Sequence, residues 1–145
     1  MVGLRVETGM AIAALALHVA FIAYMTSLYF ALSKPIAPTN IILFPLQLAA
    51  QGVFLFGLTG FGLAGIAYML SRRDALRIVS FILIAQGIIM PLGMLYTSTM
   101  AGNINIEYRS SELLFLPTIF LIAGFAPIGL GVHLVKLKPA RRRIM

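Results

Sequence analysis

The chain has 145 residues, the length of a single domain, and 61% of them are apolar while only 10% are charged. Ordinary soluble domains carry about 25% charged residues, so this composition excludes a water-soluble fold and predicts a membrane protein. The net charge of +7 does not indicate nucleic-acid binding, because the basic residues lie at the ends of apolar segments and form no stripe along one face.

Four apolar segments reach the length of about 20 residues that a helix needs to cross a bilayer. The predicted spans cover residues 9–33, 40–70, 72–100 and 111–136. The first is too long for a signal peptide and no small-residue cleavage site follows it, so we expect it to be retained. The sequence therefore predicts an all-α integral membrane protein, a four-helix bundle that forms one domain over residues 1–145.

The second span is rich in glycine and contains no Asp, Glu, Lys or Arg. Gly57, Gly60 and Ala64 are spaced to share one helix face, and Gly60 with Ala64 forms a small-xxx-small pair. Such a face lets another helix backbone approach closely, so we predict that it is a helix-packing surface. The helix that packs there could belong to this bundle or to another subunit, and the sequence does not distinguish the two.

Proline and polar residues mark the connection between the first two spans. Lys34 and Pro35 end the first helix, because the residue before a proline is disfavoured in the α conformation. Thr39 or Asn40 is predicted to cap the second helix, which places Pro45 in its early turns, where a lost hydrogen bond is least harmful.

The turn after the second span is expected to be tight. Ser71 and Asp74 have the spacing of a capping box, which predicts that the second helix ends near Leu70 and the third starts at Arg72. So short a connection predicts that the second and third helices are antiparallel neighbours. Three prolines are expected to kink or interrupt the later helices: Pro91 in the third, Pro117 and Pro127 in the fourth.

The positive charges predict the orientation. With four spans, nine of the 11 Lys and Arg residues fall on the side of the chain ends: Arg5, Arg72, Arg73, Arg77, Lys136, Lys138, Arg141, Arg142 and Arg143. The other side holds Lys34 and Arg109. The positive-inside rule therefore predicts that both termini are cytoplasmic in a cytoplasmic-type membrane. Six arginines are interpreted as topology signals that could also contact anionic lipid: Arg72, Arg73, Arg77, Arg141, Arg142 and Arg143.

Five uncharged polar residues inside the spans are the candidate site residues. Counted at 1.5 Å per residue, His18, Gln86 and Thr59 lie roughly 12, 15 and 17 Å from the cytoplasmic end, in one layer. Lipid offers no hydrogen-bond partners, so we predict that these three turn inward and that His18 contacts Gln86. Gln47 and Gln51 are four residues apart on one helix face and form a separate outer pair.

Each of these residues has a chemical and a structural interpretation. His18 could bind a metal or haem or accept a proton, Met90 and Met94 could bind Cu(I), and Gln47 with Gln51 could bind a quinone headgroup. Packing and interhelical hydrogen bonding explain the same residues, and we favour that interpretation. Because no charged residue lies deep in a span, proton relays and ion-coupled carriers are disfavoured. No catalytic residue, metal site or cofactor is predicted, although bound lipid is compatible with the basic residues.

The chain has no cysteine, which excludes disulfides, thiolate zinc sites and Cys-ligated iron–sulfur clusters. We therefore predict a structural or accessory subunit of a larger membrane complex, with other transmembrane subunits and lipids as partners and no nucleic acid. The size and topology are similar to those of small subunits in respiratory or membrane-monooxygenase assemblies, a similarity of shape that no residue carries. One alternative is a small transporter or channel for an uncharged solute, lined by His18, Gln51, Thr59 and Gln86. Another is a metal- or quinone-binding enzyme subunit.

Overall fold

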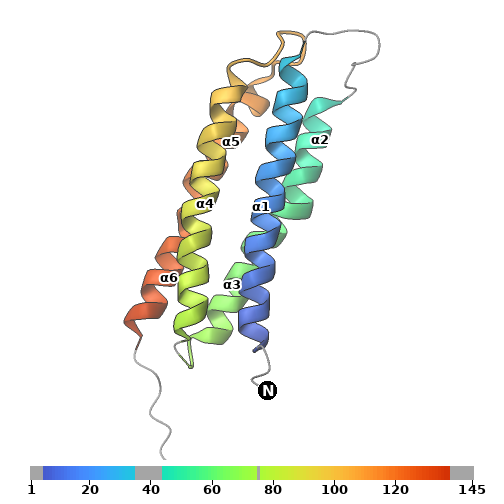
Figure 1. The fold of residues 1–145 in the computed structure, drawn as a ribbon. Coiled ribbons are helices and arrows are strands. Elements are labelled where there is room, and N and C mark those ends of the chain that lie inside the picture. The colour runs from blue at the N-terminus through green and yellow to red at the C-terminus, as the bar shows by residue number, and fades with distance from the viewer. Residues whose placement is uncertain (1–4, 35–43, 75, 138–145) are drawn as a thin grey trace, which may run out of the picture.

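The protein is a bundle of long helices (Figure 1), seen in a computed structural model that describes residues 5–34, 44–74 and 76–137. Four helical segments are long and apolar enough to cross a membrane: Val6–Ser33, Pro45–Ser71, Arg77–Ala101 and Ser111–Lys136. Two of them are α1 (Val6–Ser33) and α4 (Arg77–Ala101). The others are composite, made of α2 (Pro45–Gly52), the π-helix η1 (Val53–Leu58) and α3 (Thr59–Ser71), and of α5 (Ser111–Ala123) and α6 (Ala126–Lys136).

The second span starts later than the sequence predicts. Phe44 adopts a left-handed conformation with φ of 58°, and Pro45 is the first residue of α2. Proline suits this position because its missing N–H would have no helical partner there, and its fixed φ is already helical. Pro45 is therefore at the start of the helix rather than inside its early turns. Thr39 and Asn40 lie outside the described residues.

The predicted capping box between the second and third spans is wrong. Ser71 is the last residue of α3 and is fully buried, and α4 begins only at Arg77 with Leu76 as its N-cap. Asp74 instead pairs with Arg5 at 3.2 Å, which joins this turn to the start of α1. Ser71 is buried by packing and Asp74 forms an ion pair, so neither residue caps α4.

The helix α1 is the common neighbour of the second and third spans. Its main interfaces are with α3 and α4, whereas α3 and α4 contact each other far less. The second and third spans, predicted to be antiparallel neighbours, thus contact each other much less than each contacts α1. The start of α1, the α3–α4 turn and the end of α6 lie together at the lower end in Figure 1, which we call the inner end.

The prolines have weaker effects than expected except near the middle of the fourth span. Helix α4 runs unbroken through Pro91, and α5 contains Pro117 without interruption. The break falls at Gly124 and Phe125, immediately before Pro127 in the first turn of α6.

The core has two parts. The inner part is built largely from small side chains, which allow close helix packing: Ala11, Ala14, Ala64, Ala67, Val79, Leu83 and Leu134. The outer part contains most of the large ones, among them Phe21, Met25, Tyr29, Met90, Met94, Leu113 and Phe120. Along α1 and α4, His18 and Gln86 fall between these two clusters, so the polar pair lies where small-residue packing gives way to large-residue packing.

Candidate functional site

His18 and Gln86 form a buried hydrogen-bonded pair between α1 and α4. Both side chains are fully buried, and the amide Nε2 of Gln86 contacts Nδ1 of His18. The other ring nitrogen of His18, Nε2, lies 3.2 Å from the carbonyl oxygen of Gly57 in η1. The contact predicted between these two residues is present, and it extends to a third helical segment.

These contacts select one tautomer of His18. The carbonyl of Gly57 can only accept, so Nε2 of His18 carries the proton and donates it. Nδ1 is then an acceptor, and the Gln86 amide donates to it. The amide oxygen Oε1 of Gln86 has no hydrogen-bond partner among the described residues. A neutral imidazole therefore joins α1, α4 and η1 without any buried charge.

The π-helical segment supplies the carbonyl that His18 binds. A π-helix uses i→i+5 hydrogen bonds and is found mostly as single-turn insertions in α-helices. Two carbonyls of η1 accept side-chain hydrogen bonds: that of Gly57 from His18, and that of Phe54 from Thr59 Oγ1 at 2.9 Å. The sequence offered no signal for this segment beyond its glycine.

Thr59 does not belong to the buried layer. It is exposed, and its hydroxyl is satisfied by Phe54 on its own helix. The estimate of its depth ignored rotation about the helix axis. Adjacent residues are turned by about 100° from each other, so Thr59 lies on a different face from Gly60, which faces inward. The predicted three-residue layer is therefore wrong and reduces to His18 and Gln86.

The predicted small-residue face packs inside the bundle. A Cβ atom added to Gly60 would lie 2.7 Å from the His18 ring, and one added to Gly57 would lie 3.1 Å from Phe120. Ala64 is buried in the inner core. The ring of Phe61 meets His18 edge-on at a centroid distance of 4.5 Å. The missing side chain of Gly60 thus leaves the space that the imidazole occupies.

The outer pair is separate from this site. Gln47 and Gln51 are both exposed on the surface of α2. The four residues proposed to line a solute path therefore do not share one: His18 and Gln86 are sealed inside, while Gln51 and Thr59 face outward. The transporter alternative loses the lining that the sequence suggested for it.

The two methionines proposed as Cu(I) ligands are core residues in this structure. Met90 and Met94 are fully buried in the outer core, where they pack among aromatic and aliphatic side chains. Within residues 5–34, 44–74 and 76–137, no group of three His, Cys, Asp or Glu side chains is placed to hold a metal ion.

Several interhelical hydrogen bonds were not predicted. Tyr29 is fully buried and donates to the carbonyl of Leu113 in α5. Tyr24 donates to the carbonyl of Leu48 at 2.8 Å, and Ser80 to that of Gly131 at 2.6 Å. These bonds could have been predicted from the hydroxyl residues inside the apolar spans, since lipid offers a hydroxyl group no hydrogen-bond partner.

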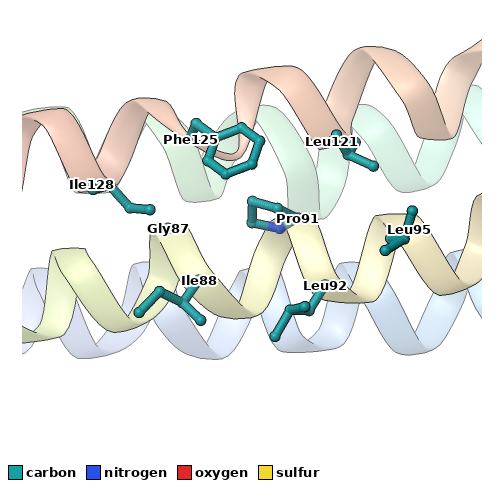
Figure 2. Close-up of a pocket in the computed structure, with 8 residues that line it drawn as sticks. All are labelled: Gly87, Ile88, Pro91, Leu92, Leu95, Leu121, Phe125 and Ile128. Atoms are coloured by element: carbon teal, nitrogen blue, oxygen red, sulfur yellow. The ribbon is translucent and has the colours of Figure 1, made fainter.

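An apolar groove lies where the fourth span breaks. It has a volume of about 310 Å³ and is lined by Gly87, Ile88, Pro91, Leu92, Leu95, Leu121, Phe125 and Ile128. Phe125, at the break, lies opposite Pro91 of α4 (Figure 2). No polar side chain lines it, so the groove can hold an apolar group but cannot orient a polar one.

Three of the six arginines interpreted as topology signals lie in the described residues, and all three are exposed at the inner end. Arg72 and Arg73 lie in the turn after α3, and Arg77 begins α4. Arg141, Arg142 and Arg143 lie outside the described residues. Comparison with protein-family models, curated proteins and solved structures found no match.

Proposed function

We propose that this protein is a structural or accessory subunit of a larger membrane complex. The buried polar pair supports this proposal, because both side chains are sealed, Gln86 bonds His18, and His18 satisfies a backbone carbonyl, as interhelical links do. Both side chains have no exposed surface, and neither lines the apolar groove at the break of the fourth span.

The outer face of α3 is the observation that carries the proposal. A Cβ atom added to Gly62 or Gly65 would meet nothing within 4 Å, in contrast to one added to Gly60. Glycine is unfavourable in a helix interior by about 1 kcal/mol relative to alanine, so outward glycines without a contact need another explanation. Close approach of a helix from another chain, as in small-xxx-small packing, is that explanation.

A native mass measurement after gentle solubilisation from the source membrane tests this proposal. The unaltered chain should be recovered in a large hetero-complex, and Gly62→Leu should reduce that recovery while the chain itself stays folded. Gly129→Leu is the matched control, because Gly129 also faces open space but lies on α6. Recovery of the unaltered chain as a lone homo-oligomer would argue against an accessory subunit.

The groove of Figure 2 favours a second candidate, a carrier or binding protein for a small hydrophobic solute. Its volume of about 310 Å³ and fully apolar lining suit such a molecule. Solute flux in liposomes that contain only this chain would support the carrier, and Leu92→Ala, at an exposed side chain of the groove, should then change the flux. An accessory subunit should show no flux in the same liposomes.

A further inference from the structure

A second hollow lies at the inner end of the bundle and combines charge with apolar surface. It has a volume of about 360 Å³ and is lined by Met69, Arg72, Arg73 and Leu137. Met69 lies in the last turns of α3, and Leu137 directly follows α6. We call these four residues the inner notch.

The two arginines of the inner notch carry charge that no described carboxylate neutralises. Asp74, the next residue in the chain, pairs with Arg5, and no other ion pair is found within the described residues. The guanidinium of Arg72 lies over the ring of Tyr68 at 5.9 Å, and the Tyr68 hydroxyl bonds Nδ1 of His133 at 2.7 Å. The ring of Tyr68, which His133 of α6 holds in place, thus orients the Arg72 side chain.

The apolar half of the notch continues the membrane-facing surface. Met69 is 68% exposed and ends the outward face of α3, while Arg72 and Arg73 follow where the span stops. Charged and apolar surface meet in this way at the level where a lipid's phosphate adjoins its glycerol and acyl chains. A free phosphate ion would use only the arginines.

We propose that the inner notch binds one phospholipid with an anionic headgroup. The phosphate lies between the guanidinium groups of Arg72 and Arg73, and the glycerol and first acyl carbons lie on Met69 and Leu137. The negative end of the α3 dipole opposes this binding, but it amounts to only about half an elementary charge against two full positive charges. Each arginine near an anionic membrane surface contributes about a five-fold gain in lipid affinity.

The test of this site is independent of the proposed partner surface. Gly62 lies seven residues before Met69, about 10 Å along the same helix face, but the lipid experiment uses this chain alone, without partner subunits. The outcome of the lipid experiment therefore does not depend on whether the chain is an accessory subunit.

Tryptophan fluorescence can measure the lipid at the notch, because the chain contains no tryptophan. Met69→Trp places a reporter at the notch, and Ile78→Trp places one at the same end on α4, where Ile78 is 57% exposed. Each full-length protein is reconstituted in phosphatidylcholine vesicles that contain brominated phosphatidylglycerol, and then in vesicles with the bromine on phosphatidylcholine. Quenching should show at least a five-fold preference for phosphatidylglycerol at the Met69→Trp reporter and no more than two-fold at Ile78→Trp.

Arginine substitutions in the Met69→Trp background complete the test. Arg72→Gln and Arg73→Gln should each lower the preference several-fold, whereas Arg77→Gln, which removes the same charge outside the notch, should leave it unchanged. The single substitutions keep the other basic residues of the inner end, so the orientation is preserved. Equal preference at the two reporters, or equal loss with Arg77→Gln, would overturn the site. Competition by millimolar inorganic phosphate would show a phosphate site and would overturn its assignment to a lipid.

Discussion

His18 and Gln86 are 68 positions apart in the chain and meet in the middle of the bundle, where the Gln86 amide donates to Nδ1 of His18. The opposite nitrogen of the same ring donates to the Gly57 carbonyl in the π-helical segment of the second span. Three of the four spans are thereby linked through one neutral imidazole. Because both side chains are fully buried, the expected role of the pair is to fix the relative positions of these helices.

Replacing both members of this pair should destabilise the fold by less than the sum of the two single replacements. His18→Leu or Gln86→Leu alone leaves a buried polar group without its partner, at a cost of about 1–3 kcal/mol in the free energy of unfolding. The double variant should cost less than the sum, with a coupling of about 0.5–2 kcal/mol. Unfolding in mixed micelles measures all three. Strict additivity would show that the two side chains do not act together.

The double variant also separates structure from function. If the pair is only an interhelical link, His18→Leu with Gln86→Leu should still assemble with the partners. Loss of the activity of an intact complex, with assembly retained, would instead make the pair a functional site.

Two glycines on one helix should tolerate leucine very differently. Gly60→Leu drives a side chain into the His18 ring, which already lies 2.7 Å from the position of an added Cβ, and should cost about 1–3 kcal/mol. Gly62→Leu enters open space and should leave the folded yield of the isolated chain near that of the unaltered protein. Size-exclusion recovery of folded protein in detergent measures this difference. Similar yields for both would contradict the inward assignment of Gly60.

The pair Gly131 and Gly129 makes the same comparison on α6 with a smaller change. An added Cβ at Gly131 would lie 2.8 Å from the backbone oxygen of Ser80, and backbone cannot move aside as a side chain can. Gly131→Ala should therefore lower the free energy of unfolding by about 1–3 kcal/mol, whereas Gly129→Ala should be neutral or slightly stabilising. Thermal unfolding in detergent gives both values, and a neutral Gly131→Ala would rule out the close α4–α6 contact.

Orientation can be tested at the end of the chain. The excess of Lys and Arg on the side of the chain ends predicts that a reporter fused after Met145 gives a cytoplasmic signal. A pair of fusions, one active only in the cytoplasm and one only outside it, supplies the control. An outside signal would contradict the charge argument, because with four spans it would place both termini outside.

Some of the site could have been found with one more step of sequence reasoning. The depth estimate correctly brought His18 to Gln86, because depth depends only on the rise per residue. The estimate failed for Thr59, since depth contains no information on rotation about the helix axis. The spacing that puts Gly57, Gly60 and Ala64 on one face already implied that Thr59 lies on another. The buried hydroxyls of Tyr29 and Ser80 carried a usable signal in their location inside apolar spans.

By itself, the sequence determined the number of the spans and the small-residue face of the second one. These are local properties, because a bilayer selects for apolar length and a helix places residues on faces at a fixed angle. Only the tertiary structure decided that α1 packs between α3 and α4, that Gly60 receives His18, and that Val53–Leu58 is π-helical. Those features depend on which helices meet and at what rotation, and lipid-facing and helix-facing apolar surfaces have the same composition, so hydropathy cannot tell them apart.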